Sequence, residues 1–314
     1  MGAIKTQMRG IAKIAKGATG GGILLFTILA NLNATELSTI CTNPNDCKID
    51  SIYSEVTHHG TLALGNYIQL ATKGGIDTFI NYGTITNTGN TRAFYWTDGY
   101  MRHLINYGTM GGIGGNRGDA GGTTPMSVTN YGVMGAIDTA WGSADITINN
   151  LGSIGRASND GKTRHLAGGS YSFIIQNYAL MITQNATTFN AFSGNAVDSS
   201  QVVLDGGSMH FFDANAKVIL DFGGDFSFGE AYRLDKLFVD MSGKSVLNVD
   251  FSRLTVPSDI YYLTQSGDNF IVSLDAPNSE IGILYKSNVR TMNNFYTISN
   301  AMIYPIKSQN LGGK

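Results

Sequence analysis

The sequence of 314 residues has few charged side chains, only 14% of the total. Its 21 lysines and arginines nearly balance its 23 aspartates and glutamates, and no basic stripe with interleaved aromatic residues occurs. Nucleic-acid binding depends on clustered basic side chains, so the composition argues against a nucleic-acid partner. Glycine, asparagine, threonine and serine are plentiful instead. That balance suits an extended β surface covered by neutral polar side chains.

Cysteine is also scarce, since Cys41 and Cys47 are the only two. The segment between them, Thr-Asn-Pro-Asn-Asp, consists of turn-forming residues. A metal site would need further ligands, but the histidines are scattered and form no ligand-spaced cluster. They are His58, His59, His103, His165 and His210. We therefore expect a Cys41–Cys47 disulfide that pins the first end of the fold, with no metal and no cofactor.

Catalytic motifs are missing as well. The sequence contains neither Gly-Asp-Ser-Gly nor Gly-x-Ser-x-Gly, and no glycine-rich loop that would cradle phosphate before a helix. One weak enzymatic signal exists: Asp138 and Asp145 flank Trp141, which could stack on a sugar. Cleavage of polysaccharide needs carboxylates on one face, so this group supports only an alternative hypothesis. We expect no catalytic residues.

The first 34 residues have no acidic side chain. Lys5, Arg9, Lys13 and Lys16 precede a short apolar run over Gly17–Ala30. This pattern predicts a secretory signal peptide over residues 1–34, cleaved after Ala34. A membrane anchor is the weaker interpretation because the run is short and rich in glycine. Cleavage would leave 17 basic and 23 acidic residues, a net charge of −6.

One short phrase recurs along the middle of the chain. It begins at five asparagines whose successive spacings are 25, 24, 20 and 27 residues: Asn81, Asn106, Asn130, Asn150 and Asn177. The first copy reads Asn-Tyr-Gly-Thr-Ile, and the others vary it. The second residue before each asparagine and the fourth after it are always apolar. A period in the twenties with elastic spacing indicates a solenoid whose variable parts are loops.

Each copy therefore predicts a strand, a corner and a second strand, because asparagine and glycine tolerate the sharp bend. Stacking the copies about 4.8 Å apart gives every strand a parallel neighbour and lets the asparagines hydrogen-bond in a ladder. The predicted fold class is all-β, a right-handed parallel β-helix with a C-terminal β cap. The alternative is a β-sandwich with similar strands. Whether Tyr82, Tyr107, Tyr131 and Tyr178 face in or out is left open.

These patterns divide the chain into an N-terminal cap with the disulfide loop over residues 35–60, repeats over 61–235, C-terminal coils and cap over 236–306, and a polar tail over 307–314. Two long loops are expected at Gly111–Gly122 and Asn159–Gly169. The first contains Arg117-Gly118-Asp119, a tripeptide that integrins recognise. The second carries Lys162, Arg164 and His165, which we expect to be solvated.

With its repeats, leader and cysteine pair, the chain resembles passenger domains of classical autotransporters, particularly those of epsilon-proteobacteria such as Helicobacter and Campylobacter. The segment Leu247-Asn248-Val249-Asp250-Phe251 looks like the junction that seeds passenger folding in that family. The resemblance implies export, display on the outer membrane, and virulence-related adhesion or toxin activity. It also implies an outer-membrane barrel as translocator. No barrel strands follow Ile306, so the sequence departs from the family there, and we expect a fragment, a truncated gene product or a passenger whose barrel is encoded separately.

The sequence thus predicts a non-enzymatic surface or secreted adhesin whose partners are host-cell or matrix surfaces or neighbouring bacterial cells. Function would reside on the loops of a rigid scaffold. The alternatives are a subunit resembling the vacuolating cytotoxin, or a polysaccharide-cleaving β-helix enzyme. Without a translocator, the expected location becomes the periplasm.

Overall fold

The computed structural model describes residues 34–87, 92–116, 124–141, 144–157, 163–168, 172–182, 201–205, 210–222, 228–229, 231–240, 242–256 and 261–274. It confirms the predicted fold: the chain is all-β, with parallel sheets that stack into a β-solenoid of about 5 turns. We call each turn a coil. Two compact units are present, and β20, β21 and β22 each pass from one unit into the other.

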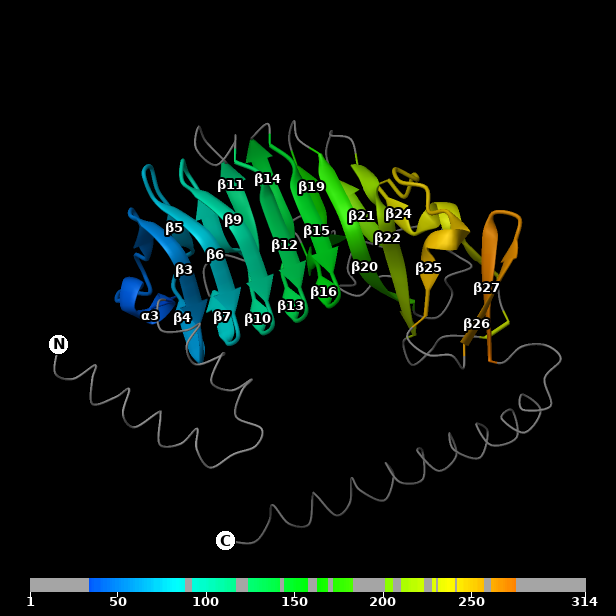
Figure 1. The fold of residues 1–314 in the computed structure, drawn as a ribbon, viewed down its shortest axis with the longest axis horizontal. Helices are drawn as coiled ribbons and strands as arrows, with labels where there is room; N and C mark the ends of the chain where they lie inside the picture. The colour runs from blue at the N-terminus through cyan, green and yellow to red at the C-terminus, as the bar shows by residue number, and fades with distance from the viewer. Residues whose placement is uncertain are drawn as a thin grey trace, which may run out of the picture. The chain divides into compact units, whose positions relative to one another are not determined.

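The larger unit contains three parallel sheets, which Figure 1 shows as side-by-side strands of successive coils. Sheet A has the order β1 (Thr35–Glu36), β3 (Ile52–His58), β6 (Gly75–Asn81), β9 (Tyr100–Asn106), β12 (Met126–Asn130), β15 (Ile146–Asn150), β20 (Phe173–Ile182) and β22 (His210–Phe222). Sheet C has the order β4 (Thr61–Leu64), β7 (Thr84–Asn87), β10 (Thr109–Met110), β13 (Val133–Met134) and β16 (Ser153–Ile154). Sheet B has the order β2 (Lys48–Ile49), β5 (Ile68–Leu70), β8 (Arg92–Trp96), β11 (Gly112–Asn116), β14 (Ile137–Trp141), β19 (Leu166–Gly168) and β21 (Val202–Asp205).

The core of this unit is a set of apolar columns, because parallel strands in register place equivalent side chains above one another. The column of sheet A comprises Val56, Phe79, Leu104, Val128, Ile148 and Ile175. These side chains are at most 1% exposed. Phe79 meets Phe94 of sheet B edge to face, with ring centroids 4.8 Å apart. The residue two places before each repeated asparagine therefore points inward, as predicted.

The N-terminal end of the solenoid is covered by the short helix α3 (Leu37–Ile40) and the loop closed by the Cys41–Cys47 disulfide. Both cysteines are buried. Pro44 in this loop accepts a hydrogen bond from the backbone N–H of Gly65 at 3.1 Å. Within the predicted cap range of 35–60, β3 belongs to sheet A and pairs with β6.

The predicted loops also differ from the structure. Within Gly111–Gly122, the segment Gly112–Asn116 is strand β11 of sheet B. Within Asn159–Gly169, β18 (Thr163–Arg164) forms a hairpin with β17 (Arg156–Ala157), and β19 continues sheet B. His165, expected in solvent, is only 4% exposed. The pairing of Leu166 with Ile137 draws the chain into the core at this point.

The smaller unit contains the end of the coils and the cap. Strand β24 (Phe238–Val239) pairs with β21, and β25 (Leu254–Thr255) pairs with β22, both in parallel. The cap is an antiparallel sheet of β23 (Ala231–Arg233), β27 (Asn269–Leu274) and β26 (Tyr261–Ser266). The short 3-10 helices η4 (Leu234–Lys236) and η5 (Phe251–Arg253) complete this unit. Tyr232 stacks on Phe270 with centroids 5.5 Å apart, so the cap has its own buried aromatic pair.

Candidate functional site: the corner between sheets A and C

The repeated Asn-Tyr-Gly phrase forms the corner at which the chain leaves sheet A and enters sheet C. Each corner is two residues long, since β6 ends at Asn81 and β7 begins at Thr84, and the neighbouring coils follow the same rule. The backbone N–H groups of Tyr107 and Gly108 both donate to the carbonyl of Asn81, at 2.8 and 3.2 Å. Equivalent bonds recur one coil later, where Tyr131 and Gly132 donate to Asn106. Every corner is therefore fixed by the corner beside it.

A ladder of buried asparagines lies beneath these corners. Nδ2 of Asn81 donates to Oδ1 of Asn106 at 2.7 Å, Asn106 donates to Asn130 at 2.7 Å, and Asn130 donates to Asn150 at 2.8 Å. None of the four is more than 1% exposed. The Nδ2 atoms of Asn81, Asn106 and Asn130 also lie within hydrogen-bond distance of carbonyls in their own corner and the next coil, as Asn81 does for Gly83 and Thr109. The ladder thus satisfies polar groups that would be costly to bury unpaired.

A column of glycines occupies the third position of the phrase. A Cβ atom on Gly108 would lie 1.9 Å from the carbonyl oxygen of Gly83, and one on Gly132 would lie 2.0 Å from that of Gly108. The same collision arises at Gly83 and Gly152, where the oxygen is 2.2 Å away. Backbone oxygen atoms cannot swing aside as a side chain can, so the stacking of coils itself requires glycine here.

The tyrosines of the phrase point outward, which resolves the orientation that the sequence left open for three of them. Tyr82, Tyr107 and Tyr131 are 45%, 49% and 47% exposed. Their rings stack in parallel, with centroids 5.2 and 4.9 Å apart and interplanar angles of 2°. Burial, followed by the neighbouring Tyr107 and Glu55, raises the pKa of the Tyr82 phenol. The Tyr82 phenol is therefore neutral at physiological pH.

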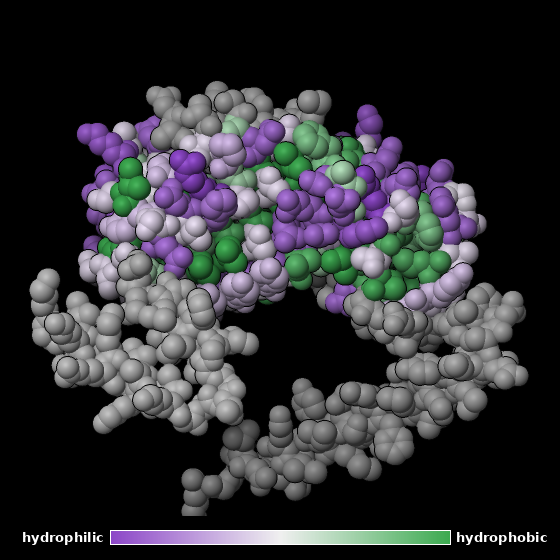
Figure 2. Space-filling model, in the orientation of Figure 1, coloured by the Kyte–Doolittle hydropathy of each residue, from purple (hydrophilic) through white to green (hydrophobic). Residues whose placement is uncertain are grey.

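A second outward column runs beside the tyrosines on sheet C. It consists of Thr61, Thr84, Thr109, Val133 and Ser153, which are paired in register across the five strands. Together with Tyr82, Tyr107, Tyr131 and Leu151, and with the glycine column between them, this column makes up what we call the corner face. The corner face has no charged side chain. Figure 2 shows the lower edge of the solenoid, below β10, β13 and β16 of Figure 1, in pale shades with green, hydrophobic groups among them.

A further copy of the phrase precedes the first predicted copy, at Asn81, by one coil. His58 pairs with Asn81 in sheet A, and the following His59, Gly60 and Thr61 take the places of tyrosine, glycine and threonine. The ring of His59 stacks on Tyr82 with centroids 5.0 Å apart. Buried His58 bonds through Nε2 to the carbonyl of Thr84 at 3.3 Å, the role that Asn81 plays toward Thr109. In the sequence, this copy could have been found from Gly60-Thr61, which precedes Gly83-Thr84 by one repeat length.

The fifth copy does not form a corner, and Asn177 is not part of the ladder. A register shift between Ile148 and Asn149 pairs Asn150 with Tyr178 and sets Asn177 beside Asn149, to which it donates at 3.1 Å. Tyr178 is consequently buried, in contrast to the other tyrosines of the phrase. The glycine position is occupied by Ala179, and β20 runs straight through to Ile182. A Cβ atom at that position is incompatible with the corner of the earlier coils.

Two histidines and a carboxylate meet at the start of the solenoid. Glu36 accepts hydrogen bonds from the backbone N–H and the ring Nδ1 of His59, at 3.0 and 2.9 Å. Nδ1 of His58 lies 3.6 Å from the same carboxylate. Burial raises the pKa of Glu36, but the bonds from His59 and the charges of both histidines outweigh it, so the pKa lies below its ordinary value. These contacts fasten β1 to the end of β3.

The residues of the enzymatic alternative have other partners. Asp138, on the outer side of sheet B, accepts a hydrogen bond from the Arg92 guanidinium at 2.5 Å. Asp145, which precedes β15, accepts one from the backbone N–H of Ser172 at 2.9 Å. The side chain of Trp141 and the tripeptide Arg117-Gly118-Asp119 lie outside the described residues. The structure therefore gives each of the two carboxylates a separate contact.

In the smaller unit, a pocket of about 420 Å³ has Asp235, Asp250 and Asp268 on its rim. Asp235 forms two hydrogen bonds with the Arg233 guanidinium, which lower its pKa. Asp250 accepts from the backbone N–H of Ser252 at the start of η5, and this bond lowers its pKa too. Both carboxylates thus have roles in holding the local backbone.

Within the described ranges, no group of three or more histidine, cysteine, aspartate or glutamate side chains is arranged to hold a metal ion. The helices in those ranges are all too short or too polar to cross a membrane. Comparison of the chain with protein-family models, curated proteins and solved structures finds no match. The corner face is therefore the candidate site that the geometry alone defines.

Proposed function

We propose that the chain is an exported β-helix that acts as a non-enzymatic binding module of the adhesin type, with the corner face as its contact surface. Support for this proposal comes from one observation: three tyrosines, each close to half exposed, lie in a strict row beside a column of small hydroxyl and methyl groups. Exposed tyrosine is enriched at protein contact surfaces because it combines a large apolar body with a polar tip.

The asparagine ladder and glycine column hold this row rigid, which favours binding because little side-chain entropy remains to be lost. Ring faces in the row are covered by neighbouring rings. A partner would therefore meet ring edges, phenolic hydroxyls and the hydroxyl column, not open aromatic faces. The corner face itself has no charged side chain, although Glu55 and the His59–Glu36 pair lie beside Tyr82 at its first end. This composition favours a largely neutral surface of a host cell, matrix or neighbouring bacterium.

Binding of the purified chain to cultured cells, matrix coatings and bacteria would test the proposal. Replacing Tyr82, Tyr107 and Tyr131 together by threonine should lower binding at least tenfold, whereas Tyr262→Thr, at a tyrosine 44% exposed in the cap, should leave it unchanged. Circular dichroism of each variant establishes that the fold persists. If the wild-type chain binds none of these surfaces, or the triple variant binds as well as wild type, the proposal fails.

Export is part of the same proposal and has its own test. The first described strand, β1, begins at Thr35, directly after the expected cleavage site. N-terminal sequencing of the protein recovered from the producing cells should therefore begin at Thr35. Recovery of a protein that still carries residues 1–34 inside the cell would contradict it. A translocating barrel, in cis or separately encoded, remains part of the proposal through the autotransporter resemblance.

A further inference from the structure

The tyrosine row has a chemical property that does not depend on any binding partner. Neighbouring phenols are exposed to solvent, parallel to within 2°, and about one strand spacing apart, with centroids at 5.2 and 4.9 Å. The backbone of each tyrosine is fixed by hydrogen bonds to the adjacent coil. Two phenols held in this way stay near one another for much longer than two phenols that meet by diffusion.

We propose that Tyr82, Tyr107 and Tyr131 form an oxidative cross-linking site, at which a haem peroxidase with hydrogen peroxide joins neighbouring tyrosines as dityrosine. Each phenol loses one electron and one proton to give a phenoxyl radical. The two radicals form one carbon–carbon bond between their ortho carbons, and the two ortho hydrogens move to the phenolic oxygens. Hydrogen peroxide accepts the two electrons and two protons and becomes two water molecules.

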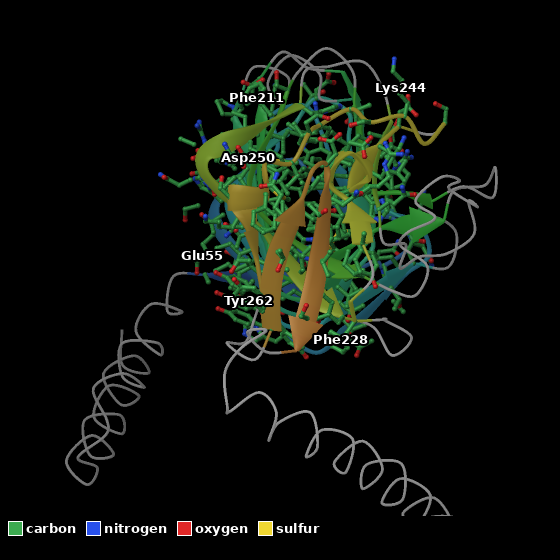
Figure 3. All side chains as sticks on the ribbon, turned by 90° about the vertical axis from the view of Figure 1, so that its right-hand side faces the viewer. Glu55, Phe211, Phe228, Lys244, Asp250 and Tyr262 are labelled. Atoms are coloured by element: carbon green, nitrogen blue, oxygen red, sulfur yellow. A yellow bond between two sulfur atoms is a disulfide. The ribbon has the colours of Figure 1, made fainter. Side chains whose placement is uncertain are left out.

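Among the described residues, the other tyrosines are less exposed than the row or have no ring neighbour. Tyr178 and Tyr232 are buried. Tyr262 matches the row in exposure, and Figure 3 shows it on the cap, but it stacks on no aromatic ring in the described part of the chain. Tyr67 and Tyr95 have ring centroids 4.6 Å apart, but their rings are inclined at 30° and both side chains are less exposed than those of the row.

The bond would connect consecutive coils, because each pair spans one turn of the solenoid. Tyr82 belongs to the corner after β6, Tyr107 to the corner after β9, and Tyr131 to the corner after β12. A covalent link across coils closes a loop of the chain and restricts its unfolded state. The modified protein should therefore resist unfolding by urea better than the unmodified protein.

The test treats the purified full chain at low micromolar concentration with horseradish peroxidase and hydrogen peroxide. Dityrosine fluorescence should appear in monomeric protein, and peptide mass spectrometry should find Tyr82 joined to Tyr107 or Tyr107 joined to Tyr131, two hydrogen atoms lighter than the separate peptides. Tyr107→Phe keeps a ring in the stack but removes the central phenol, so the yield should fall at least tenfold. Tyr262→Phe should match wild type.

Equal yields from wild type and Tyr107→Phe would overturn the proposal, as would dityrosine found only between different molecules. Should Tyr107→Phe fail to fold, Tyr131→Phe serves instead. That variant should lose the cross-linked Tyr107–Tyr131 peptide and keep the cross-linked Tyr82–Tyr107 peptide. Loss of both cross-linked peptides would also overturn the proposal. Binding activity plays no part in these readouts, so the outcome is separate from that of the adhesin hypothesis.

Discussion

Two corners of the same solenoid are built in opposite ways. The corner from sheet A to sheet C is two residues long in five successive coils, from His59-Gly60 to Leu151-Gly152. The corner from sheet B to sheet A varies in length, with connections over residues 71–74, 97–99, 117–125 and 142–145. Although every coil passes through both corners, only the corner from sheet A to sheet C has a constant length.

The difference arises from what lies across the coils. At the first corner, an amide ladder, a glycine column and an aromatic stack favour the same residue types at the same places in successive turns, and the exceptions, His58, His59 and Leu151, lie in the first and last of the five coils. At the second corner, the length of the connection changes, and β11 shifts register against β14 at Gly115/Asn116, although β12 and β15 after the corner stay in register. Contacts between equivalent residues of neighbouring coils, rather than turn propensity alone, hold the corner length constant.

The largest effect is expected when this constraint is broken at a glycine. Gly108→Ala would place Cβ 1.9 Å from the Gly83 oxygen, so it should destabilise the fold by about 3 kcal/mol or more through overpacking. Gly60 is the first glycine of the same column and has nothing within 4 Å of its Cβ position. Gly60→Ala should cost only about 1–2 kcal/mol, for its positive φ. Urea unfolding of both variants measures the difference, and equal losses would contradict the collision.

Acid should lower the stability of the fold through His165, which directly precedes β19. This side chain is buried, and burial lowers its pKa to about 4. Between pH 6.5 and 4 the unfolded chain binds a proton here that the folded chain does not. The stabilising contribution is therefore complete above pH 6.5 and declines as the pH falls toward 4, by up to about 3 kcal/mol. His165→Gln should flatten the pH dependence of urea unfolding over this range. An unchanged slope would show that His165 is not responsible.

Removing a rung from the middle of the ladder should have a slightly smaller effect. Asn106→Ala deprives the amides of Asn81 and Asn130 of a buried partner, which predicts a loss of about 2–3 kcal/mol. Asn149→Ala is the matched control: it removes one part-buried hydrogen bond, from Asn177, at a partly exposed position and should cost about 1 kcal/mol or less. The comparison fails if both substitutions cost the same.

The smallest effect concerns the first rung. His58→Asn would supply the amide found in the next four coils, so it should be neutral or stabilise the fold by up to about 1 kcal/mol. Thermal and urea unfolding at neutral pH measure it. A loss of more than about 2 kcal/mol would mean that the contacts of His58 with Glu36 and Thr84 are specific to histidine.

Much of the corner was predictable, because its residues repeat. The spacing of Asn81, Asn106, Asn130 and Asn150 predicted the ladder, and the apolar positions around it predicted the core column. The copy at His58 was missed because histidine replaces both asparagine and tyrosine there. The exclusion of Asn177 from the ladder could have been inferred from Ala179, since only glycine fits the column.

The remaining errors arose where the sequence does not repeat. The sequence predicts a loop over Gly111–Gly122 because this stretch is rich in glycine, yet Gly112–Asn116 within it is a strand, in which a Cβ atom on Gly114 would meet Arg92 and the Asp138 backbone at 2.3 and 2.4 Å. Glycine there makes room for a salt bridge between coils. The burial of His165 likewise depends on the pairing of the next residue in sheet B, which no local pattern indicates.

The most direct test of this account inserts Gly-Ser at each of the two corners, between Tyr107 and Gly108 in one variant and between Ser143 and Ala144 in the other. Loop lengthening by itself costs only a few tenths of a kcal/mol. In urea unfolding, the first insertion should lower the free energy of unfolding by about 3 kcal/mol or more, and the second should lower it by less than about 1 kcal/mol. Equal losses at the two corners would contradict the claim that contacts across coils fix the length of the first.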